Sequence, residues 1–432
     1  MEKRLQTQYQ TQIKSHMKAA TRSNPGPHCP VDVEKTTSAS QNLWRFLKND
    51  RVSLEKLIEP LRKLGRDGCR NSQSKFVLVA HDWCKLDYKS HANRKSDLLQ
   101  LTHKTDIGYD LTTALLVEAD TGITLAPMQI HLKTSEALHS TAKEPPRWEG
   151  HHLDQLETTM AEASNDWDLP RTPVHVIDRE ADSLGRLRRW HSLGHLFLVR
   201  CDDRRVRCEG RSVLLSELDE ELDQTFQYVD AGKALHEGKK VQRQVGERTV
   251  TLYRPHSAVI DGEKKSIAGK PIELRAVFVR LVDDDGWIVA QWTLLTNVPG
   301  DEADASEVGK WYYFRWRIES FFKLLKSHGL ELEYWQQETG LAIAKRLLLA
   351  AMACVLVKQL EASESEAAIK FRRHLIRLSG RRMKRGVEFT GPALLAGYYV
   401  HLNMLDYLMA TELSLEEMKD MENAALSEII DV

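Results

Sequence analysis

The segment "YYFRWRIESFFKLLK" (residues 312–326) decides how the sequence is interpreted. On an ideal helix of about 3.6 residues per turn, one side carries the polar residues Tyr312, Arg315, Glu319 and Lys326. Another side carries the apolar residues Phe314, Ile318, Phe321 and Leu325. The apolar stripe is typical of a helix packed on a core. The polar line holds one carboxylate among two cations and a phenol, which a structural helix rarely needs. An Arg315–Glu319 salt bridge at i, i+4 is the simplest structural explanation.

Two aspartates far upstream give that glutamate a different context. Asp82 closes the apolar run "FVLVAHD", and Asp178 closes "VHVID". A turn-forming aspartate after a strand is common, which explains either residue alone. A carboxylate just past a buried strand also lies at the rim of a sheet, where ligands of α/β folds bind. Together with Glu319, the two aspartates form a candidate oxygen-ligand set for two Mg²⁺ or Mn²⁺ ions, which suit in-line phosphoryl transfer.

The order of the expected elements indicates a mixed α/β core flanked by helical modules. "NLWRFLKNDRVSLEKLIEPLRKLGR" (42–66) reads as helix, loop, helix, with Ser53 as an N-cap, and "SNPGPHCP" (23–30) breaks any earlier helix. Strands and two helices follow, and alternating residues at about 202–290 predict a β-rich insertion. From 341 onward the pattern is helical again. Basic residues outnumber acidic ones in residues 1–75 and in "KFRRHLIRLSGRRMKR" (370–385), although the net charge is only −1.

That distribution fits contact with nucleic acid phosphates, and solvated helix faces explain it equally well. Neither an apolar run of 18 or more residues nor a signal-peptide core is evident, so a cytoplasmic protein without a membrane partner is expected. His151 and His152 have no cysteine or carboxylate at metal-ligand spacing and are expected to be surface histidines.

A specific resemblance joins these observations. Tyr312, Arg315, Glu319 and Lys326 match the spacing Y-x2-R-x3-E-x6-K. The sequence thereby resembles the bacterial insertion-sequence transposases of the insertion-sequence-four family, the family of the transposon-five transposase, whose YREK signature has this spacing. "DREAD" (178–182) resembles the block that carries the second catalytic aspartate of that family, and "NLWRFLKNDRVS" (42–53) is similar to its end-binding domain.

The resemblance implies a role for each matched residue. Asp82, Asp178 and Glu319 would be the DDE triad of an RNase H-like core and would hold two divalent metal ions, Mg²⁺ or Mn²⁺. Contacts with DNA are implied for the residues Tyr312, Arg315, Lys326, Trp292 and Arg200, of which Trp292 would stack on a flipped base. Core packing is the more frequent fate of a tryptophan in an apolar strand. Asp87, in "WCKLDY", competes with Asp82, which is preferred because it directly ends the apolar strand.

The implied function is cut-and-paste DNA transposition, in which the enzyme nicks one strand, forms and opens a hairpin, and transfers strands into target DNA. Residues 1–73 would bind the terminal inverted repeats, residues 74–360 would form the catalytic domain with its insertion, and residues 361–432 would be a helical region with a possible role in dimerisation. A synaptic homodimer on double-stranded DNA, associated with the bacterial nucleoid, is implied. Two alternatives stay open: a metal-dependent endonuclease that does not integrate, and a transposase-derived DNA-binding repressor or inhibitor.

Overall fold

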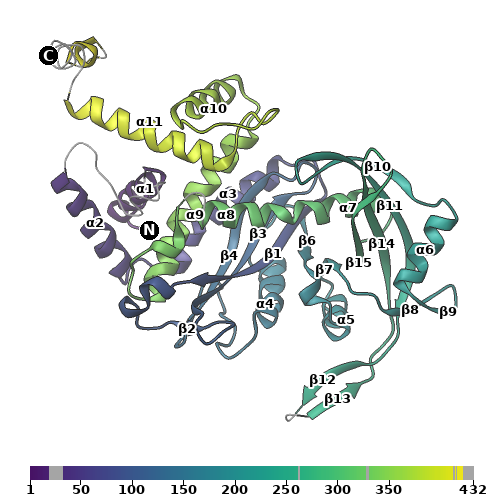
Figure 1. Ribbon diagram of the computed structural model, residues 1–432. Coiled ribbons are helices and arrows are strands. Elements are labelled where there is room, and N and C mark those ends of the chain that lie inside the picture. The colour runs from purple at the N-terminus through teal and green to yellow at the C-terminus, as the bar shows by residue number, and fades with distance from the viewer. Residues whose placement is uncertain (19–32, 261–262, 327–329, 412–413, 415, 422–432) are drawn as a thin grey trace. The chain divides into compact units, whose positions relative to one another are not determined.

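The computed structural model describes residues 1–18, 33–260, 263–326, 330–411, 414 and 416–421 (Figure 1). The "SNPGPHCP" stretch expected to break a helix lies outside them. The chain divides into two compact units. The first contains Met1–Leu57, Leu86–Gly108 and Phe321–Val432, and the second contains Ile58–Lys85 and Tyr109–Ser320.

The first unit is mainly helical. Its helices are α1 (Lys3–Lys18), α2 (Val33–Lys48), the start of α3 (Leu54–Asn71), the end of α8 (Trp316–Leu325), α9 (Gly340–Ala362), α10 (Glu366–Leu378) and α11 (Gly391–Thr411). It also holds the short elements η1 (Lys89–Arg94), β2 (Leu99–Gln100) and η3 (Leu332–Tyr334). Helix α1 was not expected, because its mean composition is polar. Its apolar residues recur every four positions, at Leu5, Tyr9, Ile13 and Met17, and all four are buried.

The long helix α9 is apolar on all sides. By length and composition it could cross a membrane, yet 83% of its most apolar window is buried within the structure, as in a core helix. Its two buried cations are satisfied by polar groups. Lys345 Nζ donates to the carbonyl oxygens of Leu47 and Asn49, and Arg346 donates to His16 and Gln337. These bonds join α9 to the residues around helices α1 and α2.

The second unit is built on a mixed sheet, as expected for an α/β core. Its first strands are β1 (Phe76–Asp87), β3 (Ile107–Glu118), β4 (Thr124–Lys133), β5 (Leu138–Ser140), β6 (Thr172–Ile177) and β7 (Leu196–Arg200). They lie in the order β5-β4-β3-β1-β6-β7. Strands β1, β6 and β7 are parallel, whereas β3, β4 and β5 pair antiparallel. Parallel neighbours need crossover connections, which helices α4 (His152–Asn165) and α5 (Leu184–Ser192) supply.

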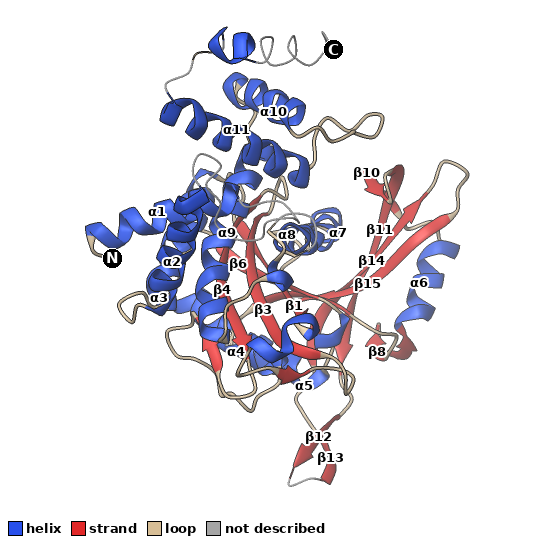
Figure 2. Ribbon diagram, turned by 60° about the vertical axis from the view of Figure 1, so that its left-hand side comes forward, coloured by secondary structure: helices blue, strands red, loops and turns tan. Residues whose placement is uncertain are grey.

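Most of the strands found in the β-rich region expected at 202–290 continue this sheet. They are β8 (Arg205–Cys208), β9 (Arg211–Leu214), β10 (Val229–His236), β11 (Lys239–Leu252) and β14 (Ile272–Val282), with helix α6 (Leu215–Gln224) among them. Strand β15 (Ile288–Thr296) pairs with both β7 and β14, so it joins the two halves of the sheet (Figure 1). Strands β15, β14 and β11 lie side by side in Figure 2. Strands β12 (His256–Ile260) and β13 (Glu263–Ile267) form a separate hairpin.

Side chains alternate between the two faces of the central strands. Val77 and Val79 of β1 pack with Cys69 of α3 and Trp167 in one core cluster, while Phe76 contacts Trp311 on the other face. A second cluster joins α4 and α5 to β6 and β7 through residues such as Ile177. One face of the sheet is therefore covered by α3, α4 and α5, and the other meets α7 (Ala305–Phe314).

The segment 312–326 is not a single ideal helix. It holds the end of α7 and the whole of α8, separated at Arg315, where i→i+3 hydrogen bonds replace the α-helical pattern. The predicted apolar stripe is confirmed, since its four residues, Phe314, Ile318, Phe321 and Leu325, are all buried. Phe314 packs so closely on Gly122 that an added Cβ would lie 2.4 Å from its ring, and Gly122 also has a φ of +70°. The turn before β4 thus positions α7.

Candidate active site

Asp82 and Asp178 lie at matching positions on neighbouring parallel strands. The register pairs Ala80 of β1 with Val176 of β6, and each aspartate follows two residues later. Both therefore point to the same face as Phe76, the face that meets α7. The sequence placed Asp82 at the end of its strand, but β1 continues to Asp87. The pairing of β1 with β6 ends at Ala80 and Val176, so the two strands are no longer paired where the aspartates lie.

Arg315 brings the third carboxylate to this edge. Its guanidinium lies 3.6 Å from Asp82 Oδ2, 3.7 Å from Asp178 Oδ2 and 2.9 Å from Glu319 Oε1. The Arg315 side chain is only 6% exposed, whereas Glu319 is 43% exposed. The i, i+4 salt bridge expected as the simplest explanation exists, but the same guanidinium also contacts both strand-borne aspartates. The arrangement is thus more than a helix-stabilising pair.

Two further groups contact Asp178. The hydroxyl of Tyr312 donates to its Oδ1 at 3.0 Å, and Arg200 Nη1 at the end of β7 lies 3.9 Å from the same oxygen. The backbone N–H of Arg179 also donates to Oδ1. Asp178 is therefore surrounded by donors and positive charge, as an anionic carboxylate requires.

The two aspartates differ in pKa. Burial raises the pKa of Asp82 to about 6, with Arg315 opposing the shift and the Glu319 and Asp178 charges adding to it. Burial also acts on Asp178, but Arg315, the Arg179 N–H and the Tyr312 hydroxyl outweigh it and hold the pKa of Asp178 below its ordinary value. Burial and the Asp178 charge raise the pKa of Tyr312 to about 12, so this phenol stays protonated and keeps donating.

The donor set fits hard divalent cations. Three carboxylates converge on one guanidinium, so the surrounding protein already stabilises positive charge here. Oxygen ligands of this kind suit Mg²⁺ and Mn²⁺. Asp82, Asp178 and Glu319 are the residues that would hold such ions.

The other carboxylates of the "DREAD" block have different partners. Asp182 is paired with Arg204 and accepts the N–H of Asp202, so it fixes the chain after β7. Glu180 contacts His152 and Trp83. Asp87, the competitor of Asp82, accepts the backbone N–H of Lys89. Of the two candidates, Asp82 is the one that contacts Arg315.

Trp292 and Lys326, two of the residues for which DNA contact was expected, have partners within the protein. Trp292 is only 7% exposed and packs against Tyr312 and Trp316, with ring centroids 6.1 and 5.5 Å away. Trp316, in helix α8, is the more exposed of these two tryptophans. Lys326 lies beyond the end of α8 and forms an ion pair with Glu333 at 2.9 Å, within the first unit.

His151 and His152, expected to be unremarkable surface histidines, have a carboxylate partner after all. Glu180 lies beside them in the second unit, and the three could hold a metal ion. Sequence reasoning missed this group because Glu180 is far from the histidines along the chain. The glutamate of "DREAD" was the only available signal.

Comparison with known proteins finds a match to one protein family. Residues 149–356 match the family described as "Transposase DDE domain", a range that includes Asp178 and Glu319 and begins after Asp82. DDE transposases use divalent metal ions. Among solved structures, the chain is similar to the cryo-EM structure of a piggyBac transposase synaptic complex with hairpin DNA, at 10% identity and a TM-score of 0.35, covering 98% of this chain and 76% of that one. No curated protein matches the sequence.

Proposed function

We propose that this chain, a DNA transposase with a DDE domain, moves an insertion sequence by cut-and-paste and belongs to the insertion-sequence-four family. The observation that carries the proposal is the convergence of Asp82, Asp178 and Glu319 on Arg315. These three residues are the proposed catalytic triad. The order β4-β3-β1-β6-β7, with two antiparallel and three parallel strands, supports an RNase H-like core.

The triad would hold two divalent ions, Mg²⁺ or Mn²⁺. Such ions activate a nucleophile and stabilise the leaving oxygen in phosphoryl transfer. The protein's own groups orient these carboxylates. Tyr312 and Arg200 hold Asp178, and Arg315 offsets the repulsion among the three anions.

DNA contact is proposed for Tyr312, Arg315, Lys326, Trp292 and Arg200. Of the two arginines beside the carboxylates, Arg200 is more accessible than Arg315, because its side chain is about one-third exposed and lies 3.9 Å from Asp178. Tyr312 and Arg315 are buried, so a phosphate would approach them from the side on which Asp178 and Glu319 are partly exposed. Phosphate contacts of this type fix DNA register without reading sequence.

The remaining parts of the proposal concern the whole reaction. Residues 1–73 bind the terminal inverted repeats, residues 74–360 form the catalytic domain with its insertion at about 202–290, and residues 361–432 assist dimerisation. The reaction runs through strand nicking, hairpin formation and opening, and transfer into target DNA within a synaptic homodimer. The enzyme works in the cytoplasm, on the nucleoid. The basic segment at 370–385 contacts DNA or the second protomer.

The decisive experiment supplies the purified full chain with DNA carrying the inverted repeats that flank its coding region. Wild-type protein with Mg²⁺ is expected to give nicks, then hairpins, then strand-transfer products. Glu319→Gln removes one carboxylate while keeping its size and is expected to abolish all three. Asp284→Asn, a neutralised exposed carboxylate on the turn before β15, is the matched control and should retain them.

Each other outcome would contradict the proposal in a different way. Cleavage that survives Glu319→Gln unchanged would refute the triad. Nicks without strand transfer would identify a metal-dependent endonuclease, and tight binding without any cleavage would identify a repressor or inhibitor.

A further inference from the structure

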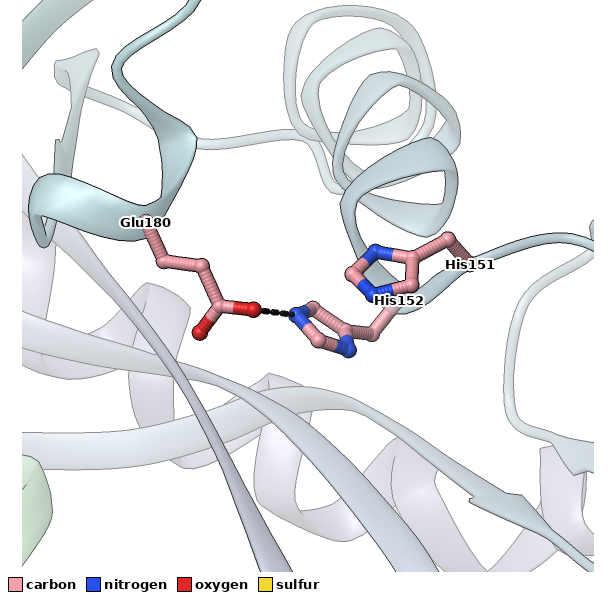
Figure 3. Close-up of side chains that lie close together, drawn as sticks. All are labelled: His151, His152 and Glu180. Carbon is pink, nitrogen blue, oxygen red and sulfur yellow. Dashed lines mark hydrogen bonds and ion pairs between the residues drawn. The ribbon is translucent and has the colours of Figure 1, made fainter. Parts of the chain in front are cut away.

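Two histidines and a glutamate meet at the N-terminus of α4, apart from the carboxylates of the candidate active site. His152 Nε2 lies 2.9 Å from Glu180 Oε1, and the rings of His151 and His152 are 3.8 Å apart (Figure 3). One possible ligand atom from each of the three residues lies within 4.8 Å of the others. Ligand atoms at this spacing are close enough to share one metal ion.

The three side chains come from two elements, the start of helix α4 and the short helix that follows Asp178. His151 caps α4, where its Nδ1 accepts the Leu153 N–H, and His152 is the first residue of the helix. Glu180 belongs to the short helix η2 (Arg179–Ala181), which directly follows Asp178. An ion bound here would join the start of α4 to the segment that carries the second aspartate of the active site.

Outer contacts hold the proposed ligands in place. The second nitrogen of His152, Nδ1, lies 3.9 Å from Asp110 Oδ2, so a carboxylate faces the side of the ring away from Glu180. Trp83 stacks on the His152 ring with centroids 4.2 Å apart and donates from Nε1 to Glu180 Oε2 at 2.8 Å. Histidine ligands of metals usually donate from the second nitrogen to a carboxylate, and Asp110 is the carboxylate on that side of the ring, although at 3.9 Å it lies beyond hydrogen-bond distance.

We propose that His151, His152 and Glu180 bind a zinc-class transition-metal ion. Two imidazoles and one carboxylate suit Zn²⁺, Co²⁺ or Ni²⁺, whereas Mg²⁺ prefers oxygen ligands alone. Three protein ligands leave further coordination positions for water.

This site is separate from the proposed catalytic one. Asp82 and Trp83 are consecutive residues of β1, so their side chains point to opposite faces of the sheet. Asp82 faces Arg315, whereas Trp83 faces His152 and Glu180. The ion therefore positions η2 behind the active site and takes no part in the reaction.

The test uses full-length chain stripped with a chelator, in a Glu319→Gln background that weakens binding at the active site. Titration with Co²⁺, followed by its visible absorption, is expected to show one bound equivalent that Zn²⁺ displaces and excess Mg²⁺ does not. Glu180→Gln and His151→Ala should each remove that signal. His191→Ala, which deletes an exposed histidine elsewhere in the second unit, is the matched control and should keep it.

Asp110→Asn tests the outer contact while leaving all three ligands intact. It should weaken Co²⁺ binding by about ten- to a hundredfold. Circular dichroism of each metal-free variant confirms that lost binding does not reflect unfolding. Absence of Co²⁺ or Zn²⁺ binding to the folded chain would overturn the proposal, as would binding that persists in the His151→Ala and Glu180→Gln double variant. Neither result would affect the transposase assignment, which is tested by DNA products.

Discussion

The hydroxyl group of Tyr312 donates a hydrogen bond to Oδ1 of Asp178 and so connects helix α7 to the end of strand β6. We predict that Tyr312→Phe raises the pKa of Asp178, because it removes a donor that stabilises the anion. Loss of about 0.5–1.5 kcal/mol corresponds to a reduction in cleavage of up to roughly tenfold. The acid limb of the pH–rate profile should move to higher pH. Tyr313→Phe, whose hydroxyl donates to the Leu235 carbonyl, is the control, and an unchanged Tyr312→Phe profile would contradict the prediction.

Arg315 supplies the positive charge that the three carboxylates share. Its replacement in Arg315→Gln should lower the thermal midpoint of the metal-free protein, because breaking a buried ion pair costs about 3–5 kcal/mol. Mg²⁺ should recover more of the lost stability in this variant than it adds to the wild type, since a divalent ion can offset the same repulsion. Calorimetry with and without Mg²⁺ measures both effects. Equal Mg²⁺ shifts in the two proteins would show that the carboxylates do not depend on Arg315.

The carboxylate of Asp82 should lower the stability of the metal-free protein at pH 7 and yet be required for DNA cleavage. Its pKa of about 6 in the folded protein exceeds its ordinary value of 3.8, so its contribution to stability is complete below 3.8 and is lost as the pH rises through 6. Asp82→Asn should therefore raise the metal-free unfolding free energy at pH 7, by about 1–2 kcal/mol. The gain should shrink toward pH 5, and cleavage should be abolished. Chemical denaturation at both pH values measures the gain, with Asp284→Asn as the control.

Buried histidines should make the second unit sensitive to acid. Burial lowers the pKa of His131 and of His81 to about 3, and that of His175 well below its usual range. Each favours the neutral form in the fold, so its stabilisation is complete above about 6.5 and is lost as the pH falls toward 3. His131→Gln should reduce the slope of unfolding free energy against pH by about 1.4 kcal/mol per unit below pH 6.5. An unaltered slope would show that His131 is accessible to protons in the folded state.

The two neighbouring tryptophans should respond differently to truncation. Trp292 is buried, so Trp292→Ala should destabilise the protein by about 3–5 kcal/mol. Trp316 is partly exposed beside it, so Trp316→Ala should leave the thermal midpoint nearly unchanged while weakening binding to DNA ends with unpaired bases. Calorimetry and a binding titration separate the effects. If Trp316→Ala binds DNA ends with unpaired bases as tightly as the wild type does, Trp316 is not the residue that stacks on such a base.

Features set by residues close together in the sequence could be predicted, whereas features that depend on contacts between distant residues could not. Asp82 and Asp178 end visible apolar runs, so their common edge followed from local pattern, and the apolar stripe of 312–326 followed from helical spacing. The break at Arg315 did not, because it accompanies contacts with two aspartates that only the fold brings near. Core packing of Trp292 was the more frequent fate expected of a tryptophan in an apolar strand, but its partners Tyr312 and Trp316 could not be identified from the sequence.

Long-range partners also explain what was overlooked. Helix α1 is too polar on average to reveal its buried stripe, which becomes apparent only against the rest of the first unit. The pair His151 and His152 lacked a ligand nearby in sequence, and Glu180 reaches it from another element. Such three-part arrangements leave no periodic signature in a single sequence.

The pairing of β15 with both β7 and β14 constrains how this protein could be shortened. Removing residues 202–290 would take away β14 and leave Trp292–Leu295 as an unpaired strand edge beside β7. Bare edges of apolar strands recruit other chains and promote aggregation. The inserted strands therefore act as the cover of the central sheet, and a compact version of the enzyme would need a new protecting strand or a charged edge in their place.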